Sequence, residues 1–166
     1  MLVEKIQIDI TTDCNSHCGG CIRNKDGGEA TVELVHLPLE IFKKIDFKNV
    51  QVVYFNGAYG DFTMHPNVLD IVDSIPKHVN VDASTNGGVR NTTWWKQYAN
   101  ALKKFPKSRT TFAIDGLLTN QLYRRGVDIE KVLENAQAFI DAGGTARWKY
   151  VLFEHNKFEL EEASAL

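Results

Sequence analysis

Long apolar runs, a basic stripe and cysteines outside one short segment are all missing from this sequence. Its longest apolar stretches are strand-sized, so no segment has the length needed to cross a bilayer. The N-terminus has neither the charge layout nor the apolar length of a signal peptide. A net charge of −2 with scattered lysines disfavours a dedicated nucleic-acid-binding protein. These absences predict a cytoplasmic protein that is not inserted in a membrane.

Cysteine occurs only at Cys14, Cys18 and Cys21. Three thiols cannot all pair within one chain, and spacings this short close strained rings, so a secreted disulfide framework is disfavoured. Structural zinc stays open as an alternative because His17 lies inside the loop, although zinc ligands usually come as two separated pairs. A four-iron cluster held entirely by protein needs four thiolates, so three thiolates would leave one iron open for chemistry.

The length of 166 residues favours one domain with a real core, and 43% apolar and 24% charged residues are typical of a soluble globular protein. Strand-like and helix-like patterns alternate along it. The predicted strands are 3–11, 50–56, 79–85, 110–115 and 146–153, and the predicted helices are 38–46, 66–75, 92–105, 128–142 and 157–166. Thr92 or Thr93 is expected to open the third helix.

Five such β-α units in sequence predict an α/β fold with a parallel sheet and right-handed crossovers. A closed eight-unit barrel typically needs ~200–250 residues, so the expected architecture is an open partial barrel. In such folds ligands collect beyond the carboxyl ends of the strands, which makes the residues that follow each strand the candidate site.

The run from Ile8 to Cys21, including Asn15 after the first cysteine, resembles the CxxxCxxC loop of the radical S-adenosylmethionine (radical SAM) superfamily. The resemblance implies a 4Fe–4S cluster on Cys14, Cys18 and Cys21, with S-adenosylmethionine chelating the fourth iron. It also implies that an electron from the cluster cleaves this cofactor to a 5′-deoxyadenosyl radical, which abstracts hydrogen from a substrate.

Two departures from the family pattern stand out. The family usually has an aromatic residue just before the third cysteine, near the adenine, and this sequence has Gly20. Another side chain must then cover the adenine, or the adenine is held more loosely. The family core usually has six β-α units, so residues 1–166 are expected to be a radical SAM core domain that lacks the last unit.

The segment after the second predicted strand is similar to the family's Gly-Gly-Glu-Pro motif, with Asp61 in place of the Glu. The resemblance implies that Asn56, Gly57, Tyr59, Gly60 and Asp61 hold the amino group of the cofactor. A glycine-containing turn is also a common loop on its own. After the third strand, Ser84-Thr85-Asn86-Gly87 is similar to a Thr-Asn-Gly segment, so Ser84 and Asn86 are candidate cofactor contacts or helix-capping residues.

Asp115 follows the fourth predicted strand and is the candidate catalytic residue, able to bind substrate, to organise an arginine or to form a turn. Arg124 and Arg125 are expected to be a solvated surface pair, with the alternative that one of them binds a carboxylate. Lys149 or Tyr150 on the fifth strand, and Asn156 after it, are further cofactor-binding candidates.

Several side chains are expected to have structural roles. His36, His65 and His78 lack motif partners, and Trp94-Trp95 is expected to anchor the third helix to the sheet.

The expected partners follow from the same resemblance. They are an electron donor such as flavodoxin or ferredoxin, a peptide or small-molecule substrate, and a second copy or partner subunit at the open edge of the sheet. Two rival functions stay open, namely a cluster-bearing partner subunit without catalysis and a structural zinc-binding module.

Overall fold

The computed structural model describes residues 3–24 and 28–165. Five parallel strands form one sheet in the order β1-β2-β3-β4-β5, which confirms the predicted α/β architecture. The strands are β1 (Lys5–Gln7), β2 (Val52–Phe55), β3 (Asn80–Thr85), β4 (Arg109–Ala113) and β5 (Ala146–Lys149). An open sheet of sequential β-α units is the partial barrel expected from the chain length.

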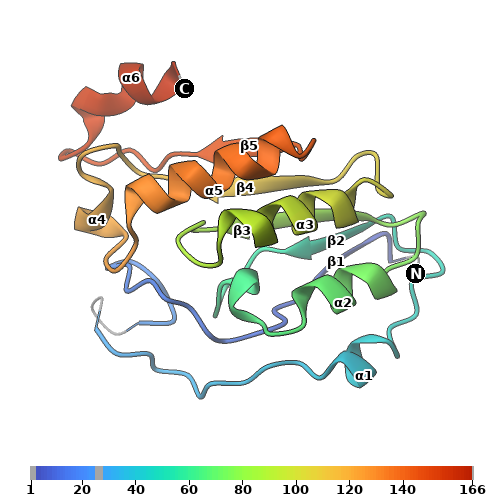
Figure 1. The fold of residues 1–166 in the computed structure, drawn as a ribbon. Helices are drawn as coiled ribbons and strands as arrows, with labels where there is room; N and C mark the ends of the chain where they lie inside the picture. The colour runs from blue at the N-terminus through green and yellow to red at the C-terminus, as the bar shows by residue number, and fades with distance from the viewer. Residues whose placement is uncertain (1–2, 25–27, 166) are drawn as a thin grey trace.

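Helices cover one face of this sheet. Figure 1 shows α2 (Val68–Ser74), α3 (Thr92–Leu102) and α5 (Ile129–Asp141) side by side on that face. The short elements are α1 (Leu39–Phe42), η1 (Phe62–Met64), α4 (Asn120–Tyr123), η2 (Lys157–Glu159) and α6 (Leu160–Ser164). In the described part of the chain, no helix combines the length and apolarity needed to cross a membrane.

The core lies between the sheet and these helices. Trp95 and Phe139 are both fully buried and both contact Phe112 of β4, with ring centroids 5.1 and 5.9 Å from it. Burying each such side chain contributes about 1.5–3 kcal/mol. Trp95 therefore anchors α3 to the sheet as predicted, whereas Trp94 stacks on Tyr98 within α3 and lies under Arg90.

The opposite, inner face of the sheet is polar. Strand register places Tyr54, Asp82 and Arg109 in one cross-strand row. The next row toward the carboxyl ends contains Ser84, Thr111 and Arg147, and Lys149 lies beyond it, opposite Ala113. Parallel strands usually carry apolar residues on both faces. A polar inner face therefore marks the side of the sheet where a ligand would lie.

Several predicted boundaries were too wide. The fifth strand ends at Lys149 because side chains take the next backbone donors, with the Val151 N–H donating to Asp115 Oδ1 and the Phe153 N–H to Asn156 Oδ1. The first strand ends at Gln7, not at residue 11. By contrast, α3 begins at Thr92 as predicted, and Asn91 caps it, since its side chain accepts from the Trp94 N–H at 2.9 Å.

The segment 110–128 also differs from expectation, because the short helix α4 was not predicted. By contrast, α5 has the predicted form. The Asp128 side chain caps its first turn at the Glu130 N–H, and Gly143 follows it with a φ of +89°. Residue 166, within the last predicted helix, lies outside the described residues.

Candidate functional site

The three cysteines line a cavity of about 170 Å³ at the carboxyl ends of the strands. Figure 1 shows the cysteine loop and α4 at the same end of the sheet. Of the residues predicted to bind the cofactor, those that line this cavity are Asn56, Gly57, Gly60, Asp61, Ser84, Asn86 and Lys149. Tyr59 and Asn156 are not among the lining residues. The topology thus brings most of the candidate residues together, and their roles stay predictions.

Backbone and side-chain contacts shape the cysteine loop. The Cys21 N–H donates to Cys18 O at 3.2 Å, which closes a turn between the last two cysteines. The Ser16 N–H donates to Cys14 Sγ at 3.4 Å, and the Ser16 hydroxyl lies 3.0 Å from Cys18 Sγ. Arg23 Nε donates to Thr12 O at 2.8 Å. Ser16 therefore contacts two of the three sulfurs, a role that the sequence pattern did not reveal.

The donor set fits an iron–sulfur cluster. Each thiolate of such a cluster binds a different iron, so the sulfurs need to face one cavity and need not converge on one point. In the described residues, no group of three or more His, Cys, Asp or Glu side chains is arranged to hold a single metal ion. His17, the fourth ligand of the zinc alternative, has Nδ1 3.0 Å from Gly28 O.

Burial, with a smaller contribution from Asp61, raises the pKa of Cys14 to about 12. The thiol is therefore protonated at neutral pH until a bound metal displaces the proton.

Asp61 joins the loop after β2 to the end of β3. Its buried carboxylate accepts hydrogen bonds from the Thr63 N–H and hydroxyl, from the Thr85 hydroxyl, and from the Asn86 N–H at 2.7 Å. The Asp61 N–H in turn donates to Asp13 O at 2.7 Å, next to the first cysteine. Asp61 is therefore a clamp on three segments of the cavity wall, because its carboxylate joins its own loop to the end of β3 and its backbone N–H binds the segment before Cys14.

The glycines of this loop allow a tight turn and a close backbone contact. Gly57 has a φ of +55°, and a Cβ there would lie 2.0 Å from Gly60 O. A Cβ on Gly60 would lie 2.2 Å from Thr11 O and 2.8 Å from Asp13 O. Gly60 therefore lets the loop pack directly on the backbone that leads into Cys14, which is a reason for glycine that does not involve a ligand.

Asn86 connects the end of β3 to the cysteine loop. Its Nδ2 donates to Asn15 Oδ1 at 2.8 Å and lies 3.7 Å from Cys14 Sγ. Its Oδ1 accepts from the Gly88 N–H at 2.8 Å, which closes a turn. The alternative prediction that this segment caps the next helix is wrong, because Asn91 caps α3. The neighbouring Ser84 hydroxyl donates to Asn56 Oδ1 at 3.2 Å. Asn86 and Asn15 together position the segment that carries the first cysteine.

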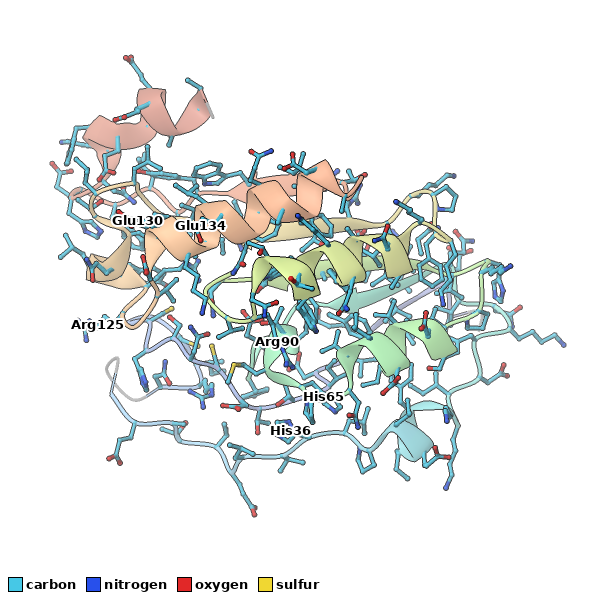
Figure 2. All side chains as sticks on the ribbon, in the orientation of Figure 1. His36, His65, Arg90, Arg125, Glu130 and Glu134 are labelled. Carbon is cyan, nitrogen blue, oxygen red and sulfur yellow. The ribbon has the colours of Figure 1, made fainter. Side chains whose placement is uncertain are left out.

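Asp115 is fully buried and organises an arginine. Its Oδ2 accepts from Arg124 Nε at 2.7 Å, and its Oδ1 accepts from the Val151 N–H at 2.6 Å. Arg124 lines the cavity, with Nη1 3.9 Å from Cys18 Sγ. The prediction that Arg124 is a solvated surface residue is therefore wrong, because Arg124 binds Asp115 at the end of β4. Arg125 is exposed, and Figure 2 shows it pointing outward beyond the cysteine loop.

Lys149 and Tyr150, the two alternatives on the fifth predicted strand, differ in whether they line the cavity. Lys149 lines the cavity, whereas the Tyr150 hydroxyl donates to Asn156 O at 2.7 Å. Asn156 itself is fully buried, and its side chain bonds Asp115 O, Val151 O and the Phe153 N–H. In this structure Asn156 holds the segment after β5 against the end of β4.

Tyr123 of α4 was not predicted as a site residue, yet it lies beside the third cysteine. A Cβ on Gly20 would lie 3.3 Å from the Tyr123 hydroxyl and 3.6 Å from its ring. Phe153 packs on the same ring, with centroids 4.6 Å apart. Tyr123 thus occupies the space beside the position where the family pattern places an aromatic residue, and no local pattern in the sequence pointed to it.

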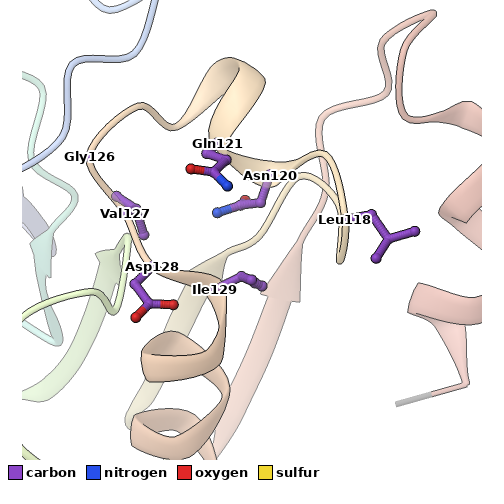
Figure 3. Close-up of a pocket in the computed structure, with 7 residues that line it drawn as sticks. All are labelled: Leu118, Asn120, Gln121, Gly126, Val127, Asp128 and Ile129. Carbon is purple, nitrogen blue, oxygen red and sulfur yellow. The ribbon is translucent and has the colours of Figure 1, made fainter.

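A second cavity, of about 370 Å³, lies on another side of α4. Figure 3 shows Asn120 and Gln121 pointing from α4 toward the first turn of α5, while Leu118 points away. Asn120 is buried, and its Oδ1 accepts from the Asp115 N–H at 2.9 Å. This contact helps to position the segment that carries Asp115 and Arg124.

The three histidines make structural contacts, as predicted. His65 is almost fully buried, with Nδ1 accepting from the Asn67 N–H at 3.0 Å and Nε2 2.9 Å from Leu37 O. His36 lies beside it in Figure 2, with ring centroids 5.3 Å apart, and contacts the Thr11 hydroxyl. His78 Nε2 lies 3.0 Å from Phe47 O.

Comparisons with known proteins agree with this geometry. The family model described as "Radical SAM superfamily" matches residues 8–163. A comparison with curated protein sequences found no match.

Three solved structures show a similar fold. Native anSMEcpe with bound AdoMet has a TM-score of 0.64 at 16% identity, covering 87% of this chain and 43% of that chain. The same protein with AdoMet and Cp18Cys peptide has a TM-score of 0.58 at 16% identity, over 87% and 42% of the two chains. BtrN in complex with AdoMet and 2-DOIA has a TM-score of 0.51 at 15% identity, over 68% and 46%.

The present chain therefore spans less than half the length of each of these structures. The family match covers nearly the whole chain, including the cysteine loop and strands β2 to β5. Members of the matched family are enzymes that use a 4Fe–4S cluster and S-adenosylmethionine. This chain belongs to the radical SAM superfamily.

Proposed function

We propose that this chain is the catalytic core of a radical SAM enzyme, which binds a 4Fe–4S cluster and cleaves S-adenosylmethionine reductively to abstract hydrogen from a substrate. The observation that carries the proposal is that Cys14, Cys18 and Cys21 line one cavity together with polar residues from the ends of several strands. When bound, the cluster and cofactor would supply the electron transfer and the radical chemistry.

In this proposal the protein holds and orients the reacting groups. Cys14, Cys18 and Cys21 are the cluster ligands, and Asn86 and Arg124 place N–H donors near two of their sulfurs. Hydrogen bonds to cluster sulfurs tune the reduction potential. Asn56 and Ser84, with the backbone of Gly57 and Gly60, form the wall that would hold the methionine end of the cofactor.

The charged side chain of Lys149 extends this wall. It is available for a carboxylate, because none of the ion pairs among the described residues includes it. Asp61 has its oxygens taken by Thr63, Thr85 and Asn86, so we assign it to holding the wall together. Asp115 is likewise assigned to positioning Arg124 and not to contact with substrate.

The substrate is a peptide or a small molecule in this proposal. Of the structures with a similar fold, one holds a Cp18Cys peptide and another holds 2-DOIA, so the fold accommodates both kinds. An electron donor such as flavodoxin or ferredoxin would reduce the cluster.

Anaerobic reconstitution tests the proposal. The wild-type chain should take up about four irons, and adding S-adenosylmethionine should change the electron paramagnetic resonance spectrum of the reduced cluster. Alanine at any one of the three cysteines should abolish stable cluster assembly, whereas Ser16→Ala should keep the ligands and retain it. Stoichiometric zinc without iron in the wild-type protein would contradict the proposal and favour a zinc-binding module.

A further inference from the structure

The inner face of β5 carries two cationic side chains, Arg147 and Lys149. Strand β5 alternates between half-buried residues, Ala146 and Trp148, and exposed ones, Arg147 and Lys149. The Trp148 Nε1–H donates to Ile114 O at 2.9 Å, which fixes the orientation of this strand. Arg147 is not among the residues that line the cysteine cavity, but the two-residue period of a strand places its side chain on the same face of the sheet as Lys149, which does line it.

Strand register places Arg147 one layer deeper than Lys149. Arg147 pairs with Thr111 and Lys149 with Ala113, and both partners on β4 line the cavity. Two residues of a parallel strand span about 6.6 Å, so the two cations occupy successive layers below the cysteine loop. The small side chain of Ala113 keeps the space above Thr111 open.

Among the residues that the structure describes, no acidic side chain forms an ion pair with Arg147. Arg109, one layer deeper on β4, is paired with Asp82, with Nη2 and Nε at 3.0 and 3.1 Å from the carboxylate. Asp115, the acidic residue at the end of β4, is paired with Arg124. Within the described ranges 3–24 and 28–165, no ion pair involves Arg147 or Lys149. The layer between these pairs therefore has an excess of positive charge.

The proposed cofactor has a single carboxylate, which can neutralise only one of the two cations. Lys149 lines the cavity and is the residue assigned to that carboxylate above. Arg147 is left over, with the Thr111 hydroxyl beside it as a second hydrogen-bond donor. An arginine next to a hydroxyl is a suitable donor set for a carboxylate or phosphate, because the guanidinium binds two oxygens at once.

We propose that the substrate carries an anionic oxygen group, a carboxylate or a phosphate, which Arg147 and Thr111 bind on the inner face of the sheet. This inference rests on the proposed function, since it takes the cysteine cavity as the reacting centre. It names Arg147 as a residue that determines substrate specificity. A substrate bound in this way extends from the layer of Arg147 toward the cluster cavity.

The first test measures anion binding on the protein without cluster or cofactor. Arginine Nε–H resonances are followed by ¹⁵N nuclear magnetic resonance while chloride is replaced by inorganic phosphate or by acetate at constant ionic strength. The Arg147 resonance, assigned with Arg147→Lys, should shift and saturate with at least one of the two anions, and the preferred anion identifies the chemical class. Thr111→Val should weaken this binding about fivefold.

Arg125 is the matched control, because it is exposed and outside the cavity. Its resonance should shift weakly and without saturation, and Arg125→Gln should leave the Arg147 titration unchanged. Equal, non-saturating shifts of Arg147 and Arg125 with both anions would overturn the proposal.

A second measurement separates this inference from the proposed function. S-adenosylmethionine binding to the reconstituted protein should be weakened by Lys149→Gln and retained by Arg147→Gln. Equal weakening in both variants would assign both cations to the cofactor and overturn the substrate assignment. If the wild-type protein bound no S-adenosylmethionine at all, the proposed function would fail, while the anion titration would still report on Arg147.

Discussion

The hydroxyl of Tyr123 lies 3.3 Å from the position that a Cβ would take on Gly20. Gly20 precedes the third cysteine, and Tyr123 comes from α4, about a hundred residues later in the chain. The ring of Tyr123 is fixed from its other side by Phe153. The ring of Tyr123 thus fills the space that a side chain at position 20 would occupy. Aromatic residues at both position 20 and position 123 would therefore collide.

This relationship predicts compensating substitutions. Tyr123→Ala should weaken S-adenosylmethionine binding about two- to tenfold, the amount expected for losing one aromatic contact. Gly20→Phe alone should be destabilising because its ring collides with Tyr123, and the double variant Gly20→Phe/Tyr123→Ala should recover much of the binding. Equilibrium dialysis on the reconstituted protein measures both effects. Leu122→Ala, an exposed neighbour on α4, is the control, and wild-type affinity in Tyr123→Ala would refute the prediction.

Two adjacent arginines should differ in their effect on the cluster. Arg124 Nη1 lies 3.9 Å from Cys18 Sγ, whereas Arg125 is exposed. Losing an N–H donor near a ligand sulfur makes a cluster harder to reduce. Arg124→Lys should therefore lower the cluster reduction potential, and Arg125→Lys should not, as measured by an electron paramagnetic resonance redox titration. Equal potentials in the two variants would show that Arg124 does not act on the sulfur.

The Asp61 clamp should contribute strongly to stability. Asp61→Ala leaves donors of Thr63, Thr85 and Asn86 without their acceptor, at a cost of about 3 kcal/mol in the free energy of unfolding. Asp73→Ala removes an exposed partner of Lys104 and should cost about 0.5 kcal/mol or less. Urea unfolding of both variants makes the comparison, and similar losses would mean that the clamp has no special role.

Substitution of Gly60 should affect iron content as well as cofactor binding. A Cβ there would meet the carbonyl oxygens of Thr11 and Asp13, just before Cys14. Gly60→Ala should thus displace the cysteine loop and reduce iron uptake, measured after reconstitution. Ala58→Gly in the same turn is the control and should keep full iron content. Full iron uptake in Gly60→Ala would show that the loop tolerates the added carbon.

The buried His65 should make the folded protein less stable in mild acid. Burial is the main cause that lowers its pKa below the ordinary 6.5, with His36 and Arg90 acting in the same direction. The unfolded chain then binds a proton that the folded one does not, so stability falls as the pH drops below about 6.5, by at most about 1.4 kcal/mol per pH unit. Urea unfolding between pH 7 and 5 should show a smaller acid-induced loss for His65→Gln than for wild type. Parallel pH profiles would contradict this assignment.

Features set by local pattern could be predicted from the sequence. The alternation of strand and helix patterns predicted the five parallel strands, and the cysteine spacing predicted the loop at their carboxyl ends. Other features depend on contacts between distant segments. The end of β5 is set by Asp115 and Asn156, and Arg124 lies at the cavity because Asp115 binds it. Residue type alone could not distinguish Arg124 from Arg125.

The central claim is that the three cysteines support reductive cleavage of S-adenosylmethionine. Its most direct test is the amount of 5′-deoxyadenosine formed per chain after anaerobic reconstitution and chemical reduction, measured by chromatography. We predict that the wild-type protein forms it and that Cys14→Ala, Cys18→Ala and Cys21→Ala each form none. Wild-type yield from any one of these variants, or no product from a wild-type protein with a full cluster, would contradict the account.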